Sequence, residues 1–190
     1  LNGHKSMYPT RVFVWDAIRS GVPVLPVDIT HSEIRWVPTP HGVRAGLGII
    51  KGLRSSVVRQ IITERRRKPF RCLEDLCRRV HFQGDEIERL ILVNACRAFG
   101  AREDLLAEVR TAAERHGQLS LFPAKRPVLT ALEHAELLLT GIPFRKHPVE
   151  TESIPSDVRC AGEMGNFVNR TILMCGILDA CKITRTKEDG

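Results

Sequence analysis

Apolar residues recur at helical spacing through the middle of the chain. One run repeats at i, i+1, i+4 and i+5: Val57, Val58, Ile61 and Ile62. Three further runs show helical spacing: Leu73/Leu76/Val80, Ile87/Leu90/Ile91/Ala95/Ala98 and Leu105/Val109/Ala112. This spacing is typical of helices that bury one face. We therefore expect residues 41–117 to form a compact, almost wholly helical domain with a modest core of its own.

Prolines near the N-terminus and β-branched residues near the C-terminus predict non-helical structure at the two ends of the chain. Residues 1–40 carry five prolines around one helical run, Thr10–Ser20, which predicts a helix followed by extended or looping chain. In residues 157–190, alternating and β-branched residues predict strands, most clearly at Thr171–Cys175 and Ile177–Thr184. The sequence thus predicts a mainly α protein with a C-terminal β portion.

A short peptide after the central domain is predicted to dock into a partner. It follows a helix stop at Gly117 and precedes Pro123, so it cannot continue a helix. Two large apolar side chains at the end of an extended peptide suit a pocket on another protein. The alternative is that these side chains fold back into the domain's own core. The residues are Gln118, Leu119, Ser120, Leu121 and Phe122.

This peptide opens a connector at residues 118–156. Thr130 and Glu133 have the spacing of a capping box. They predict a helix over Leu132–Leu139.

Positive charge is concentrated between Arg44 and Arg79. This window holds eleven Lys and Arg against three acidic residues, a net charge of +8, whereas the whole chain carries +7. A basic block inside an otherwise neutral chain favours a polyanion partner, and phosphate backbone is the best candidate. The alternative is a solvated, arginine-rich helix end at residues 65–68.

The basic block contains the pattern of a helical hairpin. Val43–Lys51 is a short apolar segment, Gly52-Leu53-Arg54 predicts a tight turn, and Ser55 and Ser56 are good N-caps for the helix that follows. Free N–H groups at a helix start bind phosphate without reading base sequence. The alternative is an ordinary αα-hairpin with a glycine turn. The candidate DNA-binding residues are Gly48, Lys51, Gly52, Arg54, Ser55, Ser56, Arg59, Arg65, Arg66, Arg67 and Lys68.

An ordered set of segments resembles one bacterial protein family. Residues 46–54 and 68–80 resemble the helix-hairpin-helix region of the DNA polymerase III α subunit of the DnaE type. Further segments match in the same order along the chain: 1–9, 16–22, 24–29, 88–91, 94–100, 118–122, 141, 147–148 and 158–189. A replicative and an error-prone parent of this type are both open, and residues 95–100 and 147–149 lean slightly to the error-prone branch.

The resemblance implies a domain order and a set of partners. It implies the end of a fingers region at 1–40, tandem helix-hairpin-helix at 41–117, a clamp-binding peptide and connector at 118–156, and an incomplete OB domain at 157–190. The implied partners are duplex primer-template DNA, the sliding clamp and the rest of a longer polymerase chain. The chain is therefore expected to be a piece of a longer polypeptide.

One position departs from the family pattern. The hairpin of the family has Gly-hydrophobic-Gly, whereas Arg54 stands at the second glycine position. A positive φ there would carry a penalty that glycine avoids. We therefore expect either a distorted hairpin or an arginine side chain that replaces a backbone contact to phosphate.

No residues for polymerase chemistry are found. Nucleotidyl transfer needs carboxylates that hold two metal ions, and the resemblance places those aspartates upstream of this stretch. The acidic pairs Glu74-Asp75 and Asp85-Glu86 are interpreted as helix caps. No catalytic residue, metal ligand or cofactor is therefore expected here, with magnesium implied only for the full-length parent, and the chain alone should not extend a primer.

The cysteines and the hydropathy pattern favour a cytoplasmic location. The six cysteines form no C-x-x-C pair, and Cys72, Cys77 and Cys96 are predicted to be small buried hydrophobes. Reduced thiols are typical of the cytoplasm. No apolar run approaches the roughly 20 residues that span a bilayer, so no membrane partner is expected.

The sequence is also compatible with two other functions. A stand-alone DNA-binding clamp adaptor would use the same hairpin and peptide. A helix-hairpin-helix DNA glycosylase would need a catalytic Asp after the hairpin, and residues 55–70 contain none.

Overall fold

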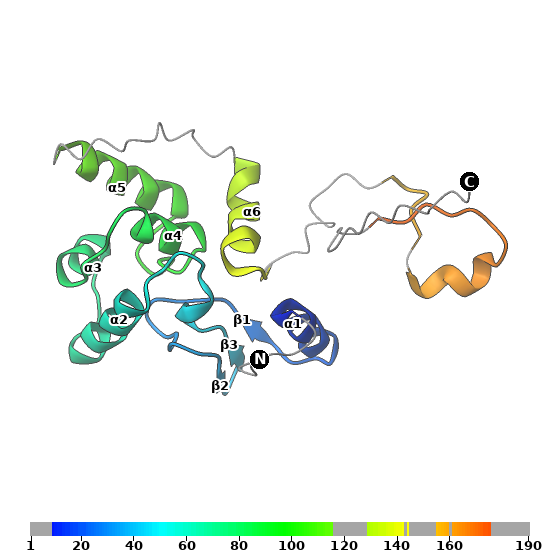
Figure 1. Cartoon of the computed structure of the whole chain (residues 1–190), viewed down its shortest axis with the longest axis horizontal. Helices are drawn as coiled ribbons and strands as arrows, with labels where there is room; N and C mark the ends of the chain where they lie inside the picture. Colours follow the sequence, from blue (N-terminus) through cyan, green and yellow to red (C-terminus); the bar gives the residue numbers. More distant parts are fainter. Residues whose placement is uncertain (1–8, 116–128, 143, 145–154, 160, 176–190) are drawn as a thin grey trace, which may run out of the picture. The chain divides into compact units, whose positions relative to one another are not determined.

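The computed structural model describes residues 9–115, 129–142, 144, 155–159 and 161–175. The chain divides into two compact units, Leu1–Phe144 and Arg145–Gly190 (Figure 1). Within the described ranges, no helix is both long and apolar enough to cross a membrane.

The first unit begins with a helix and a small sheet. Helix α1 spans Thr10–Arg19, which confirms the predicted helical run. Strands β1 (Val24–Leu25), β2 (Val37–Thr39) and β3 (Gly42–Arg44) form a mixed sheet in the order β1-β3-β2. β1 runs parallel to β3 and β2 runs antiparallel to it. The sequence predicted only extended or looping chain here, and the β2–β3 hairpin extends past residue 40.

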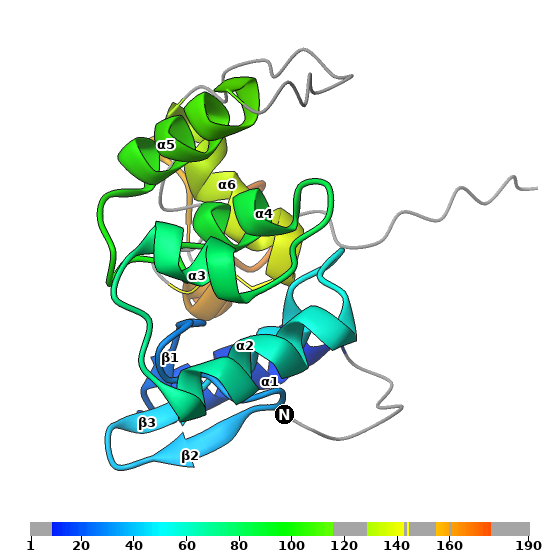
Figure 2. The same cartoon turned by 90° about the vertical axis from the view of Figure 1, so that its left-hand side faces the viewer.

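Helices make up the rest of the first unit. The bounds are η1 Leu47–Ile49 (a 3-10 turn), α2 Ser55–Arg67, α3 Leu73–Arg79, α4 Glu86–Leu92, α5 Arg102–Arg115 and α6 Leu129–Thr140. In Figure 2, β2 and β3 lie at the bottom of the unit, α2 runs above them, and α3 to α5 lie higher. The mainly helical fold predicted for the chain is confirmed.

Three local predictions are wrong. The first helix of the hairpin is only the single turn η1, because residues 42–44 pair as β3. α4 ends at Leu92, and Asn94, with φ of 60°, turns the chain before Ala95 and Ala98. α6 begins at Leu129, so Thr130 lies inside its first turn and is not the residue that caps it.

One apolar core joins these elements. The inward face predicted for α2 is buried, as are Leu76, Leu90 and Ile91 from the next two helices. Cys96 is also buried, as predicted, but Cys72 and Cys77 are exposed. Cys72 is the residue before α3 and its Sγ accepts a hydrogen bond from the Asp75 N–H, so its position is set by the helix start.

A polar contact ties the N-terminal segment to the loop after α4. The Asp28 carboxylate is buried and accepts a hydrogen bond of 2.8 Å from the Arg97 guanidinium. The neighbouring Ile29 N–H donates to the Ala95 carbonyl at 2.9 Å. Two segments far apart in sequence are thereby held side by side.

Gly46 allows two backbone segments to approach closely. A Cβ at Gly46 would lie 2.5 Å from the Ile34 carbonyl oxygen and the Arg35 carbonyl carbon. Next to it, the Leu47 N–H donates to the Glu33 carbonyl at 2.8 Å. Any side chain at position 46 would therefore push these backbones apart.

The second unit has little regular structure in its described part. It contains the 3-10 helix η2, Ala161–Phe167, and one isolated bridge between Val158 and Leu173. The strand predicted at Thr171–Cys175 is therefore wrong beyond that single bridge. The strand predicted at Ile177–Thr184 lies outside the described residues.

Candidate nucleic-acid interface

The turn before α2 has its positive φ at Gly52, and the backbone of Arg54 is not strained. Gly52 takes the left-handed conformation with φ of 79°, as glycine does most readily. Arg54 has φ of −65° and ψ of 140° and is the N-cap residue of α2. The expected penalty at Arg54 is thus absent. Ser55 and Ser56 were predicted as caps, but they are the first two helical residues, and the N-cap residue Arg54 makes no capping hydrogen bond with its side chain.

A buried carboxylate binds the start of α2. Glu86, the first residue of α4, has a side chain only 4% exposed. Its Oε1 accepts hydrogen bonds from the Arg54 backbone N–H at 3.0 Å and from Arg54 Nε at 2.8 Å. Its Oε2 accepts from Arg54 Nη2 at 2.7 Å and from the Gln83 N–H at 2.8 Å. The Arg54 side chain therefore joins the turn before α2 to the start of α4.

A second contact joins α4 to the turn at Gly52. Arg89 of α4 donates from Nη1 to the Lys51 carbonyl at 3.1 Å and pairs with Asp85 at 2.6 Å. A Cβ at Gly52 would lie 2.6 Å from Arg89 Nη1. Glycine at position 52 thus allows both the positive φ and the close approach of the Arg89 guanidinium.

The charge of Glu86 is strongly favoured in the folded protein. Hydrogen bonds from the Arg54 guanidinium are the largest influence, and together with the backbone donors they outweigh burial and lower the pKa of Glu86 from 4.5 to about 2. The carboxylate is therefore ionised across the physiological pH range.

This lowered pKa predicts a pH-dependent contribution to stability. A folded-state pKa below the unfolded value gives stability that is complete above pH about 4.5 and is lost as the pH falls towards about 2. The melting temperatures of the wild-type chain and Glu86→Gln are compared from neutral pH into this acid range. We expect the gap between them to narrow in this window. A gap that stays constant would contradict the prediction.

The basic residues predicted to bind DNA fall into two groups: those that pair with acidic residues of the protein, and exposed cations that have no ion pair. Arg65 is only 11% exposed and donates to the Ile29 and Ser32 carbonyls and to Glu33. Arg66 also pairs with Glu33 at 2.9 Å. Within the described ranges, three predicted cations are exposed and have no ion pair: Lys51, Arg59 and Lys68.

Gly48 is tied to the fold by its backbone. Its N–H donates to the Ile34 carbonyl at 3.0 Å, and a Cβ would lie 2.7 Å from that oxygen. The close approach of residue 34 thus accounts for the glycine.

The acidic pairs lie at helix starts, as predicted. Asp75 is in the first turn of α3, and its Oδ2 accepts from the Arg71 N–H at 3.2 Å. Asp85 and Glu86 stand at the start of α4. The sequence did not indicate which arginines they bind, because Arg54 and Glu86 are 32 positions apart. The predicted docking peptide, Gln118–Phe122, lies outside the described residues.

The match to a family model defines the class of this region. Residues 21–105 match the model described as "Helix-hairpin-helix motif". The matched range begins just after α1 and ends in α5, and so contains α2, α3, α4 and the Arg54–Glu86 contact.

Comparison with similar proteins narrows the class of protein to which this chain is related. It is 33% identical over 163 residues to an "Error-prone DNA polymerase" of Burkholderia pseudomallei, covering 75% of this chain and 15% of that protein. A protein of the same name from Teredinibacter turnerae is 31% identical, covering 75% of this chain and 15% of that protein. Another from Corynebacterium efficiens is 33% identical, covering 71% of this chain and 13% of that protein. The chain is homologous to a segment of the DnaE-type error-prone DNA polymerases. It spans about 15% of the length of the relatives that it matches.

Proposed function

We propose that this chain is a non-catalytic, DNA-binding portion of a DnaE-type polymerase. The observation that carries the proposal is the helix-hairpin-helix match over residues 21–105, together with the relatives named as DNA polymerases. The proposed ligand is duplex primer-template DNA, bound through its phosphates. The polymerase reaction, with its magnesium ions, is proposed for a longer parent chain.

The geometry around the hairpin supports binding of phosphates. Lys51 precedes the Gly52 turn and Arg59 lies on the exposed face of α2. Ser55 and Ser56 contribute N–H groups of the first helical turn, which lack acceptors within a helix. Contacts of this kind recognise the DNA backbone and carry no base preference.

Removing the hairpin cations is expected to weaken binding to any duplex. The variant Lys51→Ala with Arg59→Ala should lose about tenfold in affinity, and its salt slope should fall by about two, one for each phosphate contact. Binding is measured by fluorescence anisotropy on two duplexes of unrelated sequence.

The matched control keeps the same change in net charge. Arg19→Ala with Arg35→Ala removes two exposed arginines outside the hairpin. It should weaken binding by less than about threefold. Equal losses in both variants, or a strong preference for one duplex, would refute the proposed contact.

We also propose that residues 118–122 tether the polymerase to the sliding clamp. The support is the sequence alone: Leu121 and Phe122 end a peptide that Pro123 keeps out of a helix. Burial of two such side chains contributes roughly 3–6 kcal/mol before ordering costs. Gln118 would set the orientation of the peptide through its amide.

The double variant Leu121→Ala with Phe122→Ala tests this tether. Clamp binding by the 190-residue chain should be lost while its melting temperature is unchanged, because the peptide acts on a partner and not on its own core. Surface plasmon resonance on immobilised clamp and thermal unfolding give the two readings. A large fall in melting temperature, with no clamp binding by the wild-type chain, would instead place these side chains in the core.

A stand-alone clamp adaptor uses the same two contacts. It differs from the proposal only in the absence of a polymerase parent. The full-length gene separates the two, because an upstream region with paired catalytic aspartates belongs to a polymerase alone.

A further inference from the structure

Exposed arginines at the end of α2 and around α3 are held by two carboxylates. Arg67 Nη1 lies 3.0 Å from Glu64 Oε1. Arg78 Nη2 lies 3.1 Å from Asp75 Oδ1, and Arg71 Nε lies 4.0 Å from Asp75 Oδ2. We call Arg67, Arg71 and Arg78 the guanidinium surface.

The carboxylates lie inside and the guanidinium groups lie outside. The side chains of Asp75 and Glu64 are 6% and 19% exposed, whereas those of the guanidinium surface are 64–75% exposed. A ligand approaching from solvent therefore meets the cations first. Lys68 adds a further exposed charge between α2 and α3.

Arg79 joins the two carboxylates into one network. Its side chain is 17% exposed, and it pairs with Glu64 at 3.3 Å and with Asp75 at 3.4 Å. Its Nη2 also donates to the Lys68 carbonyl at 2.8 Å, and its guanidinium lies 4.5 Å from the centre of the Phe70 ring. α2 and α3 are thus fixed to each other, and this also fixes the positions of the carboxylates that hold the exposed arginines.

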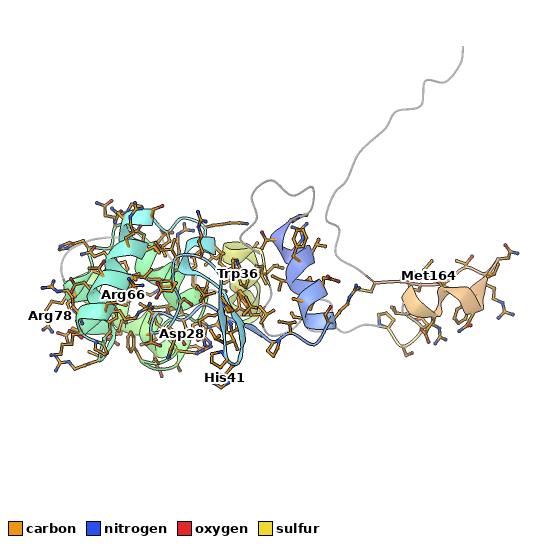
Figure 3. All side chains as sticks on the ribbon, turned by 90° about the horizontal axis from the view of Figure 1, so that it is seen from below. Asp28, Trp36, His41, Arg66, Arg78 and Met164 are labelled. Atoms are coloured by element: carbon orange, nitrogen blue, oxygen red, sulfur yellow. The ribbon has the colours of Figure 1, made fainter. Side chains whose placement is uncertain are left out.

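The two ends of α2 differ in how their charges are used. At the N-terminal end, the Arg54 side chain and N–H are directed to the buried Glu86. At the C-terminal end, Arg67 is 75% exposed beside Glu64. Figure 3 shows Arg66 and Arg78 toward the same end of the first unit. Exposed guanidinium groups with unused donors are concentrated at this end.

We propose that the guanidinium surface is a second, pre-organised phosphate-binding surface for the same duplex DNA. This inference rests on the proposed DNA-binding function. Each guanidinium has five donors, and its carboxylate uses only part of them, so the remaining N–H groups face solvent. Contact with phosphate through these remaining donors leaves the pairs with Glu64 and Asp75 in place, so it does not require the fold to open. Glu64 and Asp75 act as positioning residues.

A triple variant tests the surface against a control of equal charge. Arg67→Gln, Arg71→Gln and Arg78→Gln are combined in the 190-residue chain, and the control combines Arg19→Gln, Arg35→Gln and Arg170→Gln. The surface variant should bind duplex DNA at least about tenfold more weakly, with a salt slope smaller by about 2 to 3. The control should change affinity by less than about threefold. Equal effects in the two would overturn the proposal.

Two further measurements show whether a negative result contradicts the guanidinium surface, the proposed DNA binding as a whole, or only the folding of the variant. Absence of DNA binding by the wild-type chain at low salt refutes the proposed function itself. Wild-type binding that survives the triple variant but is lost in Lys51→Ala with Arg59→Ala overturns only this inference. If the triple variant melts early, the single variants Arg67→Gln and Arg78→Gln are measured, and each should still reduce the salt slope by about 1.

The variant Glu64→Gln tests positioning. It makes the chain more positive, so a simple field effect predicts tighter DNA binding. We expect binding about two- to fivefold weaker, because Arg67 and Arg79 lose the charged partner that orders them. Tighter binding would show that Glu64 only subtracts charge and would overturn its positioning role.

Discussion

Replacing Glu86 with alanine is expected to lower the free energy of unfolding of the first unit by about 3 kcal/mol, because several hydrogen-bond donors lose their acceptor. The carboxylate is 4% exposed and accepts the Arg54 and Gln83 N–H groups as well as two guanidinium hydrogen bonds. Alanine leaves these donors without their acceptor and removes the link between the turn before α2 and the start of α4. Urea unfolding followed by circular dichroism measures the loss.

Asp85→Ala is the matched control, one position earlier at the same helix start. Asp85 is 59% exposed and its pair with Arg89 spans one helical turn, so its loss should cost only about 0.5 kcal/mol. Arg54→Met with Glu86→Leu should be less damaging than Glu86→Ala, because it removes the buried charge with its partner. Equal costs for Glu86→Ala and Asp85→Ala would contradict this account of the contact.

Gly46→Ala is expected to destabilise the first unit by about 3 kcal/mol, at the upper end of overpacking costs. The new Cβ would lie 2.5 Å from backbone atoms of Ile34 and Arg35, which cannot rotate away. Backbone strain at Gly46 itself is not the cause, since its φ is −81°. The same urea titration reports the effect.

Gly84→Ala provides the opposite case. Gly84 has φ of 55° and nothing within 4 Å of an added Cβ, so only the left-handed backbone is penalised, by about 1 kcal/mol. A cost for Gly46→Ala no larger than that for Gly84→Ala would show that residues 34–35 move aside freely.

The helices were predictable because burial repeats along them. α2, α3, α4 and α5 each carry apolar residues at helical spacing, and the structure buries the predicted face of α2. The β1-β3-β2 sheet was missed because its strands have two or three residues each, too short for an alternation to register. Cys77 was misplaced because an apolar neighbour such as Leu76 does not fix which side of a short helix a cysteine occupies.

The candidate site was predictable in its charge but not in its pairing. Counting cations identified the basic block that holds Lys51, Arg59 and Lys68. It could not show that Arg65 turns inward to backbone carbonyls, or that Arg54 binds a carboxylate 32 positions away. Such partners are set by tertiary packing, which no local pattern encodes. Arg79 was counted only as one cation of the basic block, yet it holds two carboxylates together inside the fold.

The salt dependence of duplex binding by the intact 190-residue chain tests the central claim most directly. If several phosphates are neutralised by the hairpin cations and the guanidinium surface, the logarithm of the binding constant should fall linearly with the logarithm of salt concentration. A slope of about −4 or steeper is expected, equivalent to at least about four phosphate contacts. A slope near zero, or no binding at low salt, would contradict the assignment of this chain as a DNA-binding portion of a polymerase.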